Sequence, residues 1–146
     1  MNKIPGVWGR LKFDLAGRKR TLDEIKDKIL MWEFSEPRMH FALVPAAEGS
    51  PDLRKGAYRG ANLDKMLAGE TYQFINDKDK VRLDKDKNIL YLSPIFSWFQ
   101  KDLGDPIKFV SKYLPKEEKD FIRKNKVRIK YIKYDWSLND KGGTGE

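Results

Sequence analysis

The stretch RMHFALVPAAEGSPDLRKGAY, residues 38–58, decides how this chain is interpreted. It contains the single histidine, His40, within the short apolar run of residues 39–44. Such a run is typical of a strand that is covered on both faces, so the sequence predicts a buried strand here. The loop that follows contains Pro45, Gly49, Ser50 and Pro51, residue types that favour a turn.

Upstream of this stretch, the sequence predicts a helix that begins at Thr21. Thr21 is followed three residues later by Glu24, which is the pattern of a capping box. Apolar residues then recur at spacings of three and four, so one face of the helix is expected to pack inward. These residues are Leu22, Ile25, Ile29 and Trp32. Residues 8–15 alternate as a strand ahead of the helix and end in a basic turn.

Downstream, helices are predicted wherever a capping residue or a proline precedes an apolar pattern. The start signals are Asn62, Ser93-Pro94, Asp105-Pro106 and Pro115. Residues 81–83 and 89–92 flank the polar turn DKDKN and predict a hairpin. Residues 127–134 alternate as a last strand. This mixture predicts an α+β or mixed α/β fold with a small central sheet and helices packed around it.

The length and composition predict one folded domain. The chain has 146 residues, of which 40% are apolar, so it can bury a core. We expect the domain to span residues 1–140 and residues 141–146 to form a flexible tail. No apolar run is long enough to cross a bilayer, and the first residues lack the apolar segment of a secretory signal. We therefore expect a soluble protein, and the sequence leaves its compartment open.

The positive charge of the chain is concentrated in one segment. Lys and Arg number 30 against 22 acidic residues, a formal net charge of +8. Residues 108–133 hold ten basic and three acidic residues, a local charge of +7. Such a segment could attract nucleic acid or an acidic surface, although a solvated helix and strand is the favoured explanation.

Few residues are suited to catalysis. His40 is the only imidazole, and Ser50, in the loop ten residues further on, is the hydroxyl group that could pair with it. Burial tendencies favour His40 as a hydrogen-bonded core residue, and Ser50 as a turn residue before proline. There is no cysteine, which excludes disulfides and thiolate nucleophiles.

We predict no metal site and no cofactor. One histidine and no cysteine make a zinc site improbable. The turn DKDKN begins like a calcium loop, but Ile89 stands where that loop needs glycine and Ile95 where it needs a carboxylate. No glycine-rich segment precedes a helix, so there is no phosphate cradle.

The sequence resembles the domain-of-unknown-function 547 family. The resemblance rests on Arg38-x-His40-Phe41-Ala42-Leu43, then Ser50-Pro51-x-Leu53-Arg54-x-x-Ala57-Tyr58, then Asn62-Leu63. AGRKRTLDEIKDKIL before this region, FINDKDKVRLDKDKNILYLSPIFSWFQKDL after it and the closing YDWSLND also resemble family segments. The resemblance thus covers about residues 4–140, and it implies no activity, because the family has none assigned. Family members usually begin with a further helical segment, so the chain resembles the later portion of that domain.

This chain departs from the family at positions that matter for chemistry. The resemblance implies a cysteine in many members at the place of Pro45, and a second one in some members at the place of Ser50, where other members also have serine. It also implies a glutamate–histidine pair at the places of Lys26 and Asp27. Of the titratable groups expected there, His40 alone remains.

We therefore predict a non-catalytic domain that binds an unidentified protein or small ligand. Arg38, Arg54, Tyr58, Asp135 and Trp136 are the candidate binding residues, with bracing of the loop favoured over ligand contact for Arg54 and Tyr58. The alternative is a hydrolase or transferase that uses His40 with Ser50 or a carboxylate. A third function is binding of nucleic acid or an acidic surface through residues 108–133.

Overall fold

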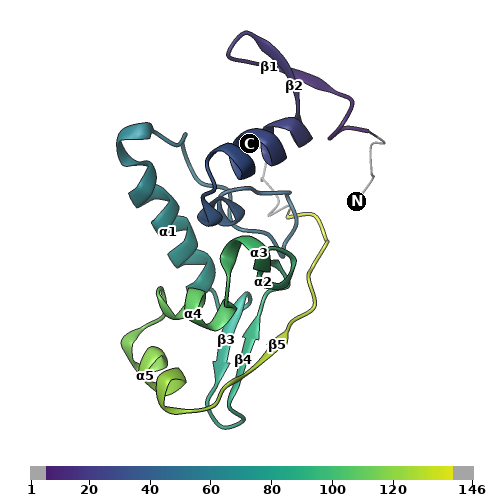
Figure 1. The fold of residues 1–146 in the computed structure, drawn as a ribbon. Helices are drawn as coiled ribbons and strands as arrows, with labels where there is room; N and C mark the ends of the chain where they lie inside the picture. The colour runs from purple at the N-terminus through teal and green to yellow at the C-terminus, as the bar shows by residue number, and fades with distance from the viewer. Residues whose placement is uncertain (1–5, 140–146) are drawn as a thin grey trace, which may run out of the picture.

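The computed structural model describes residues 6–139 and contains two small sheets (Figure 1). An N-terminal hairpin, β1–β2, lies at one end of the molecule and a three-stranded sheet, β3–β4–β5, at the other. The strands are β1 Lys12–Leu15, β2 Arg18–Thr21, β3 Val81–Asp84, β4 Ile89–Leu92 and β5 Arg128–Tyr131. The helical elements are η1 Glu24–Glu33, η2 Pro37–Phe41, η3 Gly60–Asn62, α1 Leu63–Asn76, α2 Ile95–Trp98, α3 Gln100–Leu103, α4 Pro106–Ser111 and α5 Lys116–Lys124. The predicted α+β fold is confirmed, with two sheets in place of one.

The three-stranded sheet combines a local and a long-range pairing. β3 and β4 form the predicted antiparallel hairpin, with Val81 opposite Leu92 and Asp84 opposite Ile89. β5 pairs in parallel with β4, although α2 to α5 separate the two strands in the sequence. Parallel neighbours need such a crossover connection, and here helices supply it.

Four buried phenylalanine rings form the centre of the core. Phe41 of η2 lies 5.1 Å from Phe74 of α1, 5.5 Å from Phe96 of α2 and 5.8 Å from Phe109 of α4, measured between ring centroids. Phe41 and Phe96 are fully buried. Because each ring comes from a different helix, this cluster joins η2 to the helices that carry the rest of the core.

Several predicted start signals are confirmed by their hydrogen bonds. Thr21 and Glu24 form the capping box: the Thr21 N–H donates to Glu24 Oε2 at 3.0 Å and the Glu24 N–H donates to Thr21 Oγ1 at 3.1 Å. Asp105 caps α4 by accepting from the Lys108 N–H at 3.0 Å. Asn62 precedes α1 as predicted but makes no side-chain capping bond.

The predicted strand at residues 39–44 is wrong, because this segment begins as the 3₁₀ helix η2. Pro37 stands at its first turn, and the Glu36 carboxylate accepts a hydrogen bond from the Arg38 N–H at 3.0 Å. These are helix-start signals. The apolar run is buried by packing against helices, so it needs no neighbouring strands, and burial alone does not distinguish the two structures.

The helix after Thr21 forms, but its inward face differs from the prediction. η1 is a π-helix, whose i→i+5 hydrogen bonds make each turn wider than that of an α-helix. Residues at spacings of three and four, which would share one face of an α-helix, therefore lie at different angles around the axis of η1. Trp32, predicted to pack inward, is 82% exposed.

Two further differences are local. The basic turn predicted after residue 15 is the strand β2, which pairs with β1 from Lys12–Thr21 to Leu15–Arg18. The predicted aromatic helix is interrupted at Phe99, where φ is −110° and ψ is 26°, and so forms the separate helices α2 and α3.

The predicted tail, residues 141–146, lies outside the described residues, and the prediction of one domain stays a prediction.

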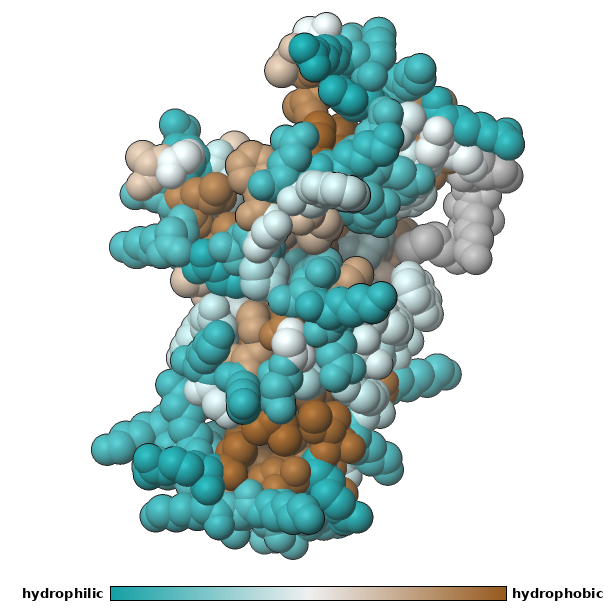
Figure 2. All heavy atoms as spheres, in the orientation of Figure 1, coloured by the Kyte–Doolittle hydropathy of each residue, from teal (hydrophilic) through white to brown (hydrophobic). Residues whose placement is uncertain are grey.

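The face of the molecule seen in Figure 2 is mostly hydrophilic, with a broad apolar area over the lower part of the three-stranded sheet and smaller apolar areas in the upper half. Among residues 6–139, no helix has both the length and the apolar character that a membrane crossing requires.

Candidate functional site

A cavity of about 720 Å³ lies between η1, the segment after η2, the α2–α3 helices and the chain after β5. This volume falls in the range typical of small-molecule sites. Its walls are mainly apolar. One wall comes from Leu22, Ile25, Leu30 and Met31, and another from Leu43, Val44, Pro45 and Pro51. The charged side chains at the cavity are Asp23, Lys26, Asp27 and Asp102, and the imidazole of His40 and the phenol of Tyr134 also border it.

His40 lies in the wall of this cavity and is held by two contacts. Its Nε2 lies 2.8 Å from Asp102 Oδ2 of α3. Its ring stacks on Phe99, with 3.8 Å between centroids and 14° between planes. The His40 residue is only 6% exposed, whereas the Asp102 side chain is 51% exposed. The predicted buried, hydrogen-bonded histidine is thus present, and it also borders a cavity.

The environment of His40 keeps its ring neutral. Burial lowers the pKa of His40 below its usual value, and the hydrogen bond and charge of Asp102 oppose this effect without cancelling it. The positive charge of Lys26 lowers the His40 pKa further. At neutral pH the ring therefore has one N–H, and donation of that N–H to Asp102 leaves Nδ1 as the proton acceptor.

The lowered pKa of His40 predicts a specific pH dependence of stability. In the unfolded chain His40 takes up a proton near its ordinary pKa of 6.5, whereas the folded ring resists protonation. The free energy of unfolding should therefore fall as the pH drops from 7.5 to 5.5. We expect His40→Gln to lose less stability over this interval in urea unfolding, because Gln does not titrate. Carboxylates titrate mostly below pH 5 and affect both proteins alike. Equal losses in the two proteins would contradict the prediction.

Aromatic side chains from two separate segments line part of the cavity. Trp98 of α2 lies 5.8 Å from Trp136 and 4.9 Å from Tyr134, measured between ring centroids. Trp98 and Trp136 are both about half exposed. The ring of Trp136, one of the predicted binding residues, thus lines the same cavity as His40.

The segment that carries Trp136 is fixed by the loop after η2. The Gly49 N–H donates to the Asp135 carbonyl at 2.9 Å and the Glu48 N–H donates to the Ser137 carbonyl at 3.0 Å. A Cβ atom at Gly49 would lie 2.9 Å from the ring of Tyr134, which is too close. Glycine at this position therefore permits the loop to approach the closing segment.

Ser50 is buried in this loop and belongs to its turn. Its Oγ donates to the Ala47 carbonyl and accepts from the Ala47 N–H at 3.2 Å. Among the described hydrogen bonds none joins Ser50 to His40, whose carboxylate partner is Asp102. The pairing of His40 with Ser50 therefore gains no support from the geometry, whereas pairing with a carboxylate does.

Arg38, Arg54 and Tyr58, also predicted to bind, lie away from the cavity. Arg38 pairs with Glu36 at 2.6 Å and with Asp64 at 2.8 Å, and these contacts raise its pKa. The Arg54 Nη1 lies 2.8 Å from the buried Glu70 carboxylate. The Arg54 guanidinium also lies 5.9 Å from the centroid of the Tyr58 ring, a cation–π distance. The Arg54–Glu70 pair links the loop to α1, and bracing of the loop by Arg54 and Tyr58 stays a prediction.

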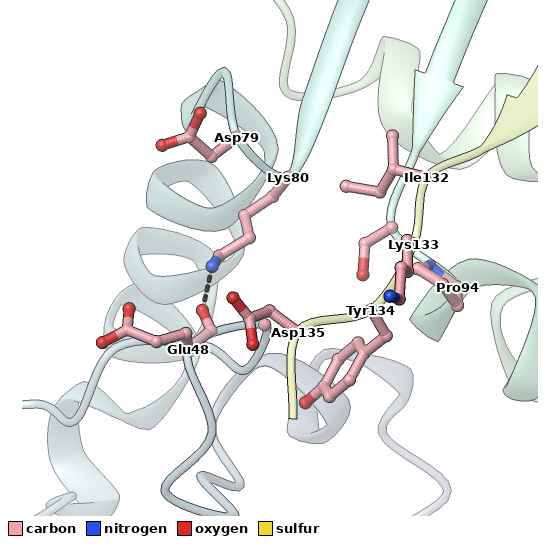
Figure 3. Close-up of a pocket in the computed structure, with 10 residues that line it drawn as sticks. Glu48, Asp79, Lys80, Pro94, Ile132, Lys133, Tyr134 and Asp135 are labelled. Carbon is pink, nitrogen blue, oxygen red and sulfur yellow. Dashed lines mark hydrogen bonds between the residues drawn. The ribbon is translucent and has the colours of Figure 1, made fainter. Parts of the chain in front are cut away.

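Asp135 borders a second, smaller cavity of about 250 Å³ (Figure 3). Its Oδ1 accepts from the N–H and the Oγ of Ser137, and these bonds lower the pKa of Asp135. The Lys80 Nζ, which borders the same cavity, donates to the Glu48 carbonyl. Asp135 and Lys80 thus have internal partners.

The basic residues of 108–133 are distributed over α4, α5, β5 and the segments that join and follow them. On one face of the sheet, Tyr91 of β4 lies between two cations, Arg82 of β3 and Lys130 of β5, at 4.8 Å and 5.9 Å from its ring centroid. Binding of nucleic acid by this segment stays a prediction. It would be rejected by an affinity that barely changes between low and moderate salt.

Within residues 6–139, no group of three or more His, Asp or Glu side chains lies close enough together to hold a metal ion.

The partner of His40 was missed by sequence reasoning. Asp102 lies 62 positions from His40, and no local pattern links the two. One signal was available: Phe99 and Asp102 are three residues apart in an aromatic helical segment, so both can face the same neighbour.

Comparison with known proteins gives one match. Residues 3–75 match the family described as "Protein of unknown function, DUF547". Neither the comparison with curated proteins nor that with solved structures finds a match. The matched half contains η1, His40 and Pro45, whereas Trp98, Asp102 and Trp136 lie beyond it. The resemblance of residues 76–140 to the family therefore stays a prediction.

Proposed function

The chain belongs to the DUF547 family of proteins of unknown function, and from this premise we propose that it is a non-catalytic binding domain whose ligand occupies the His40 cavity. The proposal depends on one observation, a cavity of about 720 Å³ with mainly apolar walls. Such cavities, with a few polar groups at defined positions, are the usual form of small-molecule sites. The ligand is thus a small molecule with a large apolar part.

The side chains at the cavity favour binding over covalent catalysis. Among the described residues that line it, none is a serine, threonine or cysteine. Positions 26, 27 and 45, where the resemblance implies other titratable or thiol groups, all border this cavity as Lys26, Asp27 and Pro45. Three of the four departures thus border the cavity, whereas Ser50 does not, and together they remove thiol chemistry and leave the apolar volume.

Binding is tested with a neutral apolar probe and a variant that fills the cavity. We expect 1-octanol to bind the wild-type protein, as measured by calorimetry. Leu43 lines the cavity, so Leu43→Trp should occupy part of the volume and weaken 1-octanol binding by about tenfold, because the ligand loses buried apolar contact.

The matched control is Leu53→Trp, the same change at a leucine that is 79% exposed and outside the cavity. This variant should bind 1-octanol within about twofold of the wild type, since exposed substitutions rarely change more. Absence of 1-octanol binding to the wild type, or equal binding by both variants, would reject the proposal.

A second candidate function is a hydrolase or transferase that uses His40 as a general base. The distance of 2.8 Å between His40 Nε2 and Asp102 Oδ2 favours it, because a carboxylate that accepts from one ring nitrogen orients the other to accept a proton. A screen of ester, amide and glycoside substrates tests this function. Turnover that disappears in a stably folded His40→Gln variant would support it, and no turnover by the wild type would reject it.

A further inference from the structure

The charged groups at the His40 cavity are mainly acidic, although the chain carries a net charge of +8. Three carboxylates, Asp23, Asp27 and Asp102, face one ammonium group, Lys26. With His40 neutral, the formal charge of these lining groups is −2. The cavity is therefore negatively charged although the chain as a whole is positively charged. The negative charge of the cavity favours a cationic ligand.

The single cation of the cavity already has partners. The Lys26 Nζ lies 3.2 Å from Asp27 Oδ1 and 5.8 Å from the centroid of the Trp8 ring. Lys26 thus compensates Asp27 and is not placed to neutralise all three carboxylates.

Asp102 retains its negative charge for a ligand. Its only described side-chain hydrogen bond joins Oδ2 to His40, and half of its side chain remains exposed. A neutral imidazole donor orients a carboxylate without cancelling its charge. A hydrogen-bond donor with a positive charge would therefore gain both a bond and a Coulomb attraction at Asp102.

The aromatic wall adds a second attraction for cations. Trp98 and Trp136 lie in one stack, with 25° between their planes, and both line the cavity. Tryptophan ring faces attract ammonium groups more strongly than other aromatic rings do. The same rings also pack against apolar chains, so the wall suits both parts of an amphiphile.

We propose that the cavity selects a small amphiphile with a cationic ammonium end, which binds Asp102, and an apolar chain, which packs between Ile25, Leu43 and Trp98. This inference rests on the proposed function, since it specifies the ligand class of the same cavity. A small molecule is favoured over a peptide, because the volume of about 720 Å³ is that of a site that surrounds a single small ligand.

The test compares three probes of equal chain length: octylammonium, 1-octanol and octanoate. Calorimetry at neutral pH and about 0.15 M salt limits long-range effects of the net charge. We expect octylammonium to bind wild-type protein most tightly and octanoate most weakly. Asp102→Asn should lower octylammonium affinity about tenfold, the effect expected for a hydrogen bond to a charged group, and leave 1-octanol affinity within about twofold.

The control variant is Asp86→Asn, which removes the same charge from an exposed turn residue between β3 and β4. It should leave the order of the three probes and their affinities unchanged. The order measured on the wild type tests the inference even if Asp102→Asn does not fold.

The two proposals fail in different ways. Binding of 1-octanol together with octanoate as tight as octylammonium would overturn the cationic preference and leave the apolar site intact. Failure of all three probes to bind would overturn both. An equal loss of octylammonium affinity in Asp86→Asn and Asp102→Asn would overturn the assignment of the ammonium site to Asp102.

Discussion

Phe41→Ala should destabilise the protein by about 3–5 kcal/mol, the cost typical of removing a buried aromatic ring. The Phe41 side chain is fully buried and contacts phenylalanine rings from α1, α2 and α4. Its removal leaves a void that three separate helices would have to fill, and rigidly packed elements collapse only partly into such a void. Urea unfolding followed by circular dichroism measures the loss.

Phe34→Ala is the matched control for this prediction. Phe34 is 59% exposed and lies at the end of η1, so its truncation should change stability by less than about 0.5 kcal/mol. If the two variants lost similar amounts of unfolding free energy, the phenylalanine cluster would not be the main contributor to the stability of this fold.

Arg54→Met should destabilise the protein by about 1–3 kcal/mol, because it leaves the Glu70 carboxylate buried without its cation. Glu70 is 7% exposed, and the Arg54 Nη1 lies 2.8 Å from its Oε1. Arg54 itself is about one-third exposed, so solvent screening keeps the effect below that of a fully buried pair. Unfolding in urea again provides the measurement.

A double variant distinguishes the ion pair from simple packing. Arg54→Met combined with Glu70→Gln removes the unpaired charge and should recover part of the lost stability. Arg59→Met, at an exposed arginine of the same loop, should have little effect. If Arg54→Met were as stable as the wild type, the bracing role would be excluded and Arg54 would be available to a ligand.

The features that were predictable from sequence are those set by neighbouring residues. The capping pairs Thr21–Glu24 and Asp105–Lys108 form as expected, because a cap needs only residues within one turn of it. The β3–β4 hairpin forms for the same reason, since its polar turn fixes the pairing. Local chemistry therefore accounts for most of the elements.

The candidate site was only partly predictable, because it depends on contacts between distant segments. His40 was identified as the only imidazole, but its contact with Asp102 depends on how η2 packs against α3. The strand expected at residues 39–44 was wrong, since an apolar run signals burial and not the backbone shape that achieves it. Trp32 was misplaced because an α-helical spacing was applied to a π-helix.

The cavity wall joins the two extremities of the described chain. Trp8 and Trp136 line the same volume, although 127 residues stand between them in the sequence. A molecule that filled the whole cavity would contact both terminal regions at once and would act as a noncovalent cross-link between them. Fraying of either region would have to break ligand contacts, so occupancy would suppress the local opening of both ends together.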